Sequence, residues 1–468
     1  MPTQVGLAPI VRVTIKDPKG NPIELGDKLK SFEWTSFING GYSIKAVFYD
    51  HLYNRINELA AQFYLENSRN IPLQASFQLG WGNTLSGALF TSKLTAFITQ
   101  IAVGGVNNSA EFGLEAIDPA SYILYNGRGD GSARKGNLSS VIKSVIDDAT
   151  TNVTSGITDI ITGEQFKLHI DVSKTNDSKN GTWYTMQMDP MTFIKSSLEW
   201  SSSLTDDKSM WVIASGMFKK DDDAADKETQ KESEIPAIFI KQWPELYSLL
   251  PANKRDLFVN VNTSTPNQND VVSIDFIGNN FISASSTELR TGGISSTTGA
   301  FYDYKTTKKT IVNDEQTPRK LNIKDLDKTL SYTKPKSSSG GNFINKGVTR
   351  VGCIPEMNGG ELGVNYVDYI DGRARQSYLD MLSNLMRIKV RVFGWHLIDD
   401  SRMLGTTVIG LNLKDSSKND SETSYFLSGR WMLYGFKHII SRNGNWYTDL
   451  FLFRLDHDSN AEIKVPIT

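Results

Sequence analysis

Few residues in this sequence have the type and spacing that catalysis or metal binding requires. The five histidines, His51, His169, His396, His438 and His457, are scattered, and none falls in HExxH or another paired ligand spacing. A metal site would therefore have to be assembled by tertiary structure alone. Each histidine is more often a surface residue or a hydrogen-bonded structural residue.

The single cysteine has no sequence context that indicates a nucleophile. Cys353 lies in GVTRVGCIPEMNGG, and the chain contains no GxSxG motif. One cysteine also excludes an intramolecular disulfide framework and any multi-cysteine zinc or iron–sulfur cluster. The residue is best interpreted as an inert thiol in a reducing compartment.

Two glycine-rich stretches and the carboxylate pairs also lack the residues that their chemistry needs. GSARKG at 131–136 has the glycine spacing of a phosphate-binding loop, but Asn137 and Leu138 replace the required Lys and Ser or Thr. NGRGDG at 126–131 would put Arg128 at a calcium-ligand position, so we interpret it as a turn. Pairs such as Asp399-Asp400 are expected by chance among 52 acidic residues. We expect no catalytic residue, no cofactor, no metal and no enzymatic activity, and the sequence leaves the partner-binding residues unknown.

Length and charge set the broad class. The chain has 468 residues, of which 39% are hydrophobic and 22% charged, enough for roughly three domains. Fifty Lys and Arg against 52 Asp and Glu give a net charge of -2, which disfavours a protein whose affinity comes from neutralising phosphates. The sequence shows neither a secretory signal pattern nor an apolar run long enough to cross a bilayer. We therefore expect a soluble protein made in a cytoplasm.

Residues 1–118 have the pattern of strands around one helix. Val11, Val13 and Ile15 alternate with polar residues, and similar runs follow near 44–48, 73–79, 94–103 and 110–117. Apolar residues between 52 and 65 instead share one helical face. This order predicts a small closed barrel or sandwich with a helix over one opening.

Residues 119–250 are predicted to form a mixed α+β domain, followed by a loop-rich insertion at 251–345. Asn137 can cap a helix, and Asp189-Pro190 can open another. Residues 219–234 hold many charges and no large apolar side chain, which is typical of a solvated loop. Residues 301–350 carry eleven basic and five acidic residues, either a solvated surface or a contact for an acidic partner.

Residues 346–468 are predicted to form a helix, from about Arg373, and a second β unit. RIKVRVF at 387–393 alternates basic and apolar residues, as a half-buried strand does, and its basic face suits water, a lumen or a subunit interface. Strands follow near 404–413 and 425–440, and Asn443-Gly444 indicates a hairpin. Trp431 and Trp446 lie at alternating apolar positions, so we expect both in the core.

The two ends of the chain resemble each other. LGWG at 79–82 has a counterpart in FGWH at 393–396, and each is followed by strands and a hairpin that ends in an acidic residue. The fold class predicted from this order is a β-rich α+β protein, with two β-barrels in one chain and an inserted mixed α/β region.

The C-terminal pattern resembles the central hub of phage baseplates, a family shared by T-even-like contractile phages and the hub portion of type VI secretion spike proteins. The residues that carry the resemblance lie in SGRWMLYGFKHIISRNGNWYTDLFLFRLD and are Ser428, Gly429, Trp431, His438, Tyr447 and Thr448. MDPMTFI at 188–194 is similar to the P-x-x-F-I helix of such hubs, and FEWTSFINGGYSIKAVFYD and FQLGWG are similar to their first tube-type barrel. The resemblance covers about 1–210 and 370–458, whereas 211–369 match no hub element.

The resemblance implies a structural, non-enzymatic virion protein of the phage tail baseplate, assembled in the host cytoplasm. Two tail-tube-like barrels per subunit would make a homotrimer quasi-sixfold, matching a tail tube on one side and a threefold central spike on the other. The implied partners are the spike, tail tube or tube-initiator proteins and baseplate wedge proteins, with genomic DNA passing through the lumen. Two alternatives stay open: a peptidoglycan-degrading tail enzyme with carboxylates from 211–369, and a receptor-binding tail protein, suggested by nine Trp and the loop-rich insertions.

Overall fold

The computed structural model describes most of the N-terminal half of the chain and separate strands of the rest. The described residues are 8–16, 22–49, 59–65, 72–82, 89–90, 93–104, 111–129, 131–161, 163–173, 181–185, 188–201, 211–219, 234–242, 256–261, 271–277, 296–303, 308–314, 348–356, 386–394, 408–413, 429–441 and 444–454.

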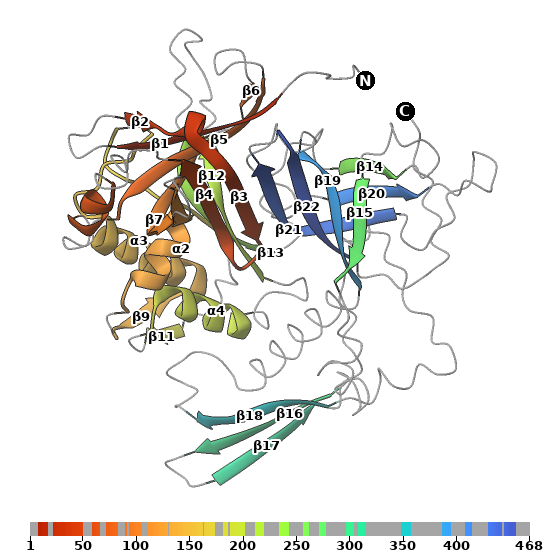
Figure 1. Cartoon of the computed structure of the whole chain (residues 1–468). Coiled ribbons are helices and arrows are strands. Elements are labelled where there is room, and N and C mark those ends of the chain that lie inside the picture. Colours follow the sequence, from red (N-terminus) through yellow and green to blue (C-terminus); the bar gives the residue numbers. More distant parts are fainter. Residues whose placement is uncertain are drawn as a thin grey trace, which may run out of the picture.

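One 14-stranded sheet contains strands from both ends of the sequence (Figure 1). Its N-terminal strands are β1 (Ala8–Lys16), β2 (Pro22–Glu24), β3 (Leu29–Phe37), β4 (Gly41–Tyr49), β5 (Gln74–Gly82), β6 (Leu89–Phe90), β7 (Leu94–Gly104) and β8 (Glu111–Ile117). Its C-terminal strands are β14 (Asp256–Val261), β15 (Val271–Phe276), β19 (Met386–Phe393), β20 (Val408–Leu413), β21 (Gly429–Ser441) and β22 (Trp446–Arg454).

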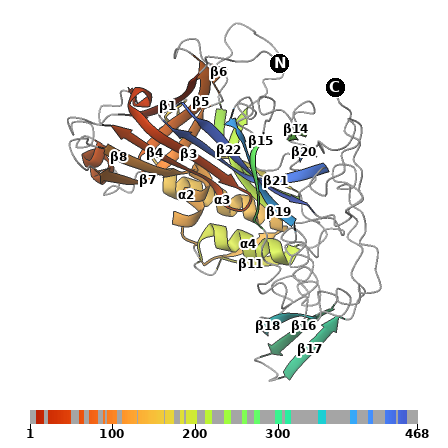
Figure 2. The same ribbon diagram turned by 45° about the vertical axis from the view of Figure 1, so that its right-hand side comes forward.

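The strand order joins these two sets directly. The main path is β15-β19-β22-β21-β3-β4-β8-β7-β5-β1-β2, with β6 beside β5, β20 beside β21, and β14 beside β20. Antiparallel pairing of β21 with β3, in which Lys437 faces Thr35, makes the junction. Figure 2 shows the strands on both sides of this junction running next to one another.

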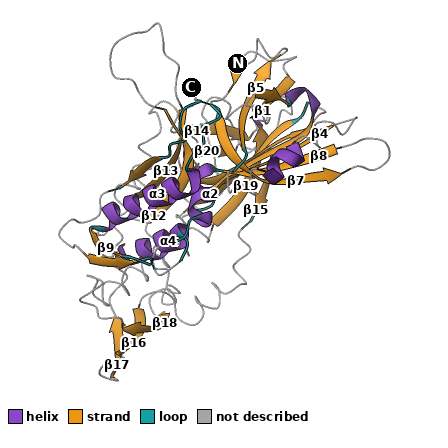
Figure 3. Ribbon diagram, turned by 90° about the vertical axis from the view of Figure 1, so that its left-hand side faces the viewer, coloured by secondary structure: helices purple, strands orange, loops and turns teal. Residues whose placement is uncertain are grey.

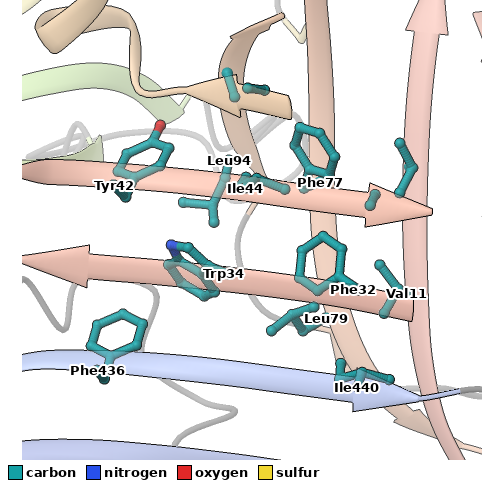
Figure 4. Packing of buried hydrophobic residues seen from close by; sticks show 14 of the residues in the cluster. Val11, Phe32, Trp34, Tyr42, Ile44, Phe77, Leu79, Leu94, Phe436 and Ile440 are labelled. Atoms are coloured by element: carbon teal, nitrogen blue, oxygen red, sulfur yellow. The ribbon is translucent and has the colours of Figure 1, made fainter. Parts of the chain in front are cut away.

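Alternation of side chains places the core on one face of this sheet. Phe32 and Trp34 on β3 are buried, as are Phe436 and Ile440 on β21, because successive residues of a strand point to opposite faces. In Figure 4 the strands that carry Phe77 and Val11 cross the single strand that carries Phe32 and Trp34. The rings of Phe32 and Phe77 lie 5.9 Å apart, although β3 and β5 are not neighbours in the sheet. The sheet therefore curls over its own apolar face.

The middle of the chain forms a smaller α+β layer (Figure 3). Its helices are α2 (Pro119–Asn126), α3 (Leu138–Thr154) and α4 (Pro190–Ser201), and its strands are β9 (Ala133–Gly136), β10 (His169–Val172), β11 (Gly181–Tyr184), β12 (Trp211–Lys219) and β13 (Glu234–Gln242). β10, β13 and β12 make one sheet, and β11 pairs with β9. As predicted, Asn137 caps α3 by accepting a hydrogen bond from Ser140 N at 2.8 Å, and Asp189 does the same for α4 through Thr192 N.

A turn and a buried carboxylate attach this layer to the large sheet. Asn39, with a φ of 61°, donates from its backbone N to Ile213 O and accepts at Oδ1 from Ile213 N, at 2.7 and 2.8 Å. The wholly buried Asp118 accepts from Tyr42 N on β4 and from Ser121 N on α2. Burial raises the pKa of Asp118, and its hydrogen bonds with Ser121, Ser215 and Tyr42 lower it less.

Strands also occupy the segment expected to be a loop-rich insertion. β14 and β15 belong to the large sheet. β16 (Ser296–Asp303) and β17 (Lys308–Asp314) form a separate three-stranded sheet with β18 (Val348–Glu356), which follows the predicted insertion, at the bottom of Figures 1 and 2. β14 pairs with β20, more than 140 residues away. A partner so distant is not visible in the local composition.

The β-rich class is thus confirmed, while the two-barrel arrangement stays a prediction. Within the described residues, the main path of the large sheet ends at β15 and β2 and does not close on itself. The predicted strands at 387–393, 404–413 and 425–440 correspond to β19, β20 and β21. Residues 59–65 are helical, as predicted, whereas the helix near Arg373 and residues 220–233 lie outside the described residues. No helix in the described part is long and apolar enough to span a membrane.

Candidate functional site

The face of the large sheet opposite the core carries a row of charged residues of both signs across seven neighbouring strands. We call the outward side of β15, β19, β22, β21, β3, β4 and β8 the polar face, and its ordered charges the charge row. The charge row consists of Asp275, Lys389, Arg391, Asp449, Lys437, Glu33, Lys45 and Glu115. Four cations and four carboxylates give it a formal charge of zero.

Strand register brings these side chains together. Arg391 faces Asp449, and Asp449 faces Lys437 on the next strand. On the other side of the β21/β3 junction, Lys45 lies opposite both Glu33 and Glu115. Cross-strand neighbours have Cβ atoms about 5 Å apart, and diagonal neighbours are within reach of long side chains. The row therefore follows from residues that point away from the core at paired positions of neighbouring strands.

The C-terminal half of the charge row is tightly paired. Arg391 donates from Nε and Nη2 to the two carboxylate oxygens of Asp449, at 2.6 and 2.8 Å. The Asp449 side chain is only 6% exposed, so this two-point contact replaces the water that the carboxylate loses. Lys389 Nζ lies 2.7 Å from Asp275 Oδ2. The hydrogen bond that Arg391 donates to Asp449 is the largest cause that raises the pKa of Arg391, with further attraction from Asp449 and Asp275.

The N-terminal half of the charge row also consists of ion pairs between neighbouring strands, but its side chains are more exposed to solvent. Lys437 Nζ is 2.8 Å from Glu33 Oε2, and Lys45 Nζ is 2.7 Å from Glu115 Oε1. The Lys45 and Glu115 side chains are 57% and 42% exposed. The hydrogen bond that Lys45 donates to Glu115, and then the charges of Glu115 and Glu33, raise the pKa of Lys45 despite slight burial. Lys45 therefore keeps its proton and its carboxylate partner at neutral pH.

Aromatic side chains flank the charge row on the polar face. Phe37 lies 4.9 Å from Phe451 and 6.1 Å from Tyr434, centroid to centroid. The guanidinium of Arg387 stands 4.7 Å from the Tyr434 centroid, a cation–π contact. The basic stripe predicted at Arg387, Lys389 and Arg391 is thus half-buried, and each member has a partner within the chain.

A buried polar network lies on the core side of β21 and β22. Trp446 Nε1 donates to His438 Nδ1 at 3.1 Å, and Thr448 Oγ1 lies 2.7 Å from the same nitrogen. The rings of Trp34 and Phe436 also contact His438. Complete burial lowers the pKa of His438 to about 3, so the imidazole is neutral. Trp446, with Trp431, belongs to the core as predicted.

The other sequence candidates do not come together as a site. His169 stacks on Phe218, with ring centroids 3.7 Å apart, and Cys353 lies in β18. His51, His396 and His457 fall outside the described residues. Among the residues that are described, no three His, Cys, Asp or Glu side chains form a possible metal cluster.

Sequence reasoning missed the charge row itself. Its signal, a charge at every second position of a strand, was visible only in RIKVRVF. The remaining members are single charges on separate strands, and their order depends on which strands pair.

Comparisons with known proteins place tail proteins among the structural neighbours. No family model and no curated protein matches the sequence. A tail protein from Neisseria meningitidis MC58 has 9% identity and a TM-score of 0.48, over 96% of this chain and 97% of that one. The 43 kDa tail protein of prophage MuSo2 from Shewanella oneidensis has 8% identity and a TM-score of 0.48, over 95% and 98%. An Escherichia coli component of the type VI secretion system, described as similar to the T4 tail proteins gp27 and gp5, has 8% identity and a TM-score of 0.39, over 94% and 76%. The solved structures similar to this chain are thus phage tail proteins and type VI secretion proteins.

Proposed function

We propose that this chain is a structural subunit of a phage tail, the baseplate hub that joins the tail tube to the central spike. Support comes from the sequence resemblance: its residues His438 and Thr448 belong to the buried network of β21 and β22, and its Trp431 is buried in the core elsewhere on β21. The P-x-x-F-I stretch of the resemblance forms the start of α4. The proposal includes a virion location after assembly in the host cytoplasm.

The observation that carries the proposal is the continuous sheet made by the two ends of the chain. Pairing of β21 with β3 joins both strand sets into one wall. One face of the wall is apolar and covered by the fold, and the other is polar and partly open to solvent. Three such walls arranged in a ring would enclose a polar channel for DNA. In this arrangement 1–118 and 346–468 are the two tube-like units, with 119–250 and 251–345 between them.

The contact between copies is proposed at the β15 edge. β15 ends the main path of the sheet, and it carries exposed apolar side chains, with Val272 48% and Phe276 61% exposed. An edge strand with such side chains suits pairing with a second chain. The homotrimer would then present one rim to the tail tube or its initiator and the other to the spike, with wedge proteins around it.

Solution mass tests the assembly. Light scattering over a range of protein concentrations should give a trimer, alone or after addition of the spike protein of the same particle. A chain that stays monomeric with both spike and tube proteins would contradict the hub assignment.

A pair of variants locates the contact between copies. Phe276→Lys should abolish the trimer and leave the folded monomer, because the new charge would have to be buried at the edge. Tyr64→Lys, at a residue 75% exposed elsewhere in the fold, is the matched control and should still form trimers. Trimers of Phe276→Lys as stable as those of the control would place the interface at another edge.

The two rival functions are tested on the same purified protein. Lysis in a peptidoglycan zymogram would replace the structural assignment by a cell-wall enzyme. Specific binding on a glycan array would favour a receptor-binding tail protein.

A further inference from the structure

The charge row has a property that an ordinary polyanion-binding surface lacks. Proteins that hold DNA present cations that exchange mobile counterions for phosphates, and the release of those ions drives binding. Here each of Lys45, Lys437, Lys389 and Arg391 already has a carboxylate counterion on a neighbouring strand. A phosphate that approached would have to displace a fixed partner and would meet its repulsion.

The pairing is built into the sheet and does not depend on chance encounters of surface side chains. Lys45 lies between Glu33 and Glu115 on the two flanking strands. Asp449 lies between Arg391 and Lys437. Backbone hydrogen bonds fix these positions, so the strand pairing itself holds each cation beside a carboxylate.

We propose that the charge row makes the polar face non-retentive toward nucleic acid: DNA can pass along it without being held, because carboxylates on neighbouring strands neutralise the four cations of the row. This inference rests on the proposed function, in which the polar face lines the path of the genome. Beyond that function, it explains how a wall that carries lysine and arginine avoids binding the DNA that moves past it.

Removal of the acidic partners should turn the face into a DNA-binding surface. The variant Glu33→Gln/Glu115→Gln keeps side-chain size. It leaves Lys45 without an acidic neighbour on either flanking strand, and it leaves Lys437 with only Asp449, which Arg391 already holds. All four side chains are at least partly exposed, so the fold should be retained. Glu24→Gln/Asp147→Asn makes the same change in net charge at exposed residues of β2 and α3 and is the matched control. The probe is a fluorescently labelled DNA duplex of random sequence, followed by anisotropy as salt is increased.

The expected gain is at least tenfold in affinity at low salt over both the wild-type chain and the control. The slope of log affinity against log salt should steepen by about two, because each uncovered cation adds about 0.9. Adding Asp275→Asn, which frees Lys389, should raise the steepening to about three. Thermal unfolding of each variant checks that the fold is intact.

Two results would overturn the inference. The wild-type chain could bind the duplex with a steep salt dependence that Lys45→Gln/Lys437→Gln removes, which would make the face a DNA-binding site. Alternatively, the acidic-partner variant could bind no better than the control. The mass of the same samples is measured by light scattering, so failure of the trimer and failure of the charge row are separate outcomes.

Discussion

The N-terminal and C-terminal parts of the large sheet bury polar groups in different ways. Around β1 to β8 the buried carboxylate of Asp118 lies at the margin, where it joins β4 to α2. In β19 to β22 the buried polar group is His438, inside the aromatic core and bonded to Trp446 and Thr448. The first arrangement fixes a neighbouring layer, and the second fixes the packing of the strands themselves. One sheet thus contains a buried carboxylate that attaches the neighbouring α+β layer and a buried histidine network that holds its own strands together.

The largest expected effect tests whether these two parts unfold together. Trp431→Ala and Phe77→Ala each remove a fully buried ring from a core that both parts share. Each should lower the free energy of unfolding by about 3–5 kcal/mol and shift one common transition, followed by calorimetry. Two transitions, of which each variant moves only one, would show that the parts are independent domains.

Acidification should change the contributions of His438 and Asp118 to folding stability in opposite directions. Folding lowers the pKa of His438 to about 3 from 6.5, so the stability it contributes at neutral pH is lost as the pH falls below 6.5. At pH 5 the loss is about 2 kcal/mol. Denaturant unfolding at pH 7 and pH 5 should show this difference in the wild type but not in His438→Gln.

Asp118 should behave in the opposite way. Its pKa is raised by burial, so its contribution is fully present below its usual value of 3.8 and is lost as the pH rises through the raised value. Asp118→Asn should remove that dependence. An unchanged pH profile in either variant would mean that its group is not the one that titrates.

Two glycines test how closely the parts are packed. A side chain at Gly394, after β19, would overlap the indole of Trp446, whereas the Cβ of an alanine at Gly113 on β8 would lie 3.8 Å from the Cβ of Ala102. Gly394→Ala should cost about 1–3 kcal/mol, and Gly113→Ala should be neutral or stabilising by up to about 1 kcal/mol. Equal melting temperatures for the two variants would contradict the close contact at Gly394.

The smallest effects compare the two ends of the charge row. A double-mutant cycle on Arg391 and Asp449 should give a coupling of about 1.5–3 kcal/mol, because a nearly buried carboxylate loses a two-point partner. The cycle on Lys45 and Glu115, both exposed, should give about 0.2–1 kcal/mol, and less at high salt. A larger coupling energy for Lys45 and Glu115 than for Arg391 and Asp449 would show that solvent exposure does not determine the strength of these ion pairs.

Local pattern predicted the elements well and their arrangement poorly. The alternation in RIKVRVF, the cap at Asn137 and the apolar positions of Trp431 and Trp446 depend on near neighbours in sequence, and the structure confirms them. The junction of β21 with β3 depends on a register between segments about 400 residues apart, which no local signal encodes. The charge row needs that register, so only its RIKVRVF portion was visible from the sequence.

The junction of β21 with β3 also has a consequence for how the chain is made. The ribosome releases β3 early, but its partner strand emerges about 400 residues later, which takes roughly 20–80 s at 5–20 residues per second. Until then the edge of β3 has unpaired N–H and C=O groups and the exposed side chains of Phe32 and Trp34, and such an edge can pair with other nascent chains. Synthesis rate and chaperone supply should therefore influence the yield of this protein more than its final stability does.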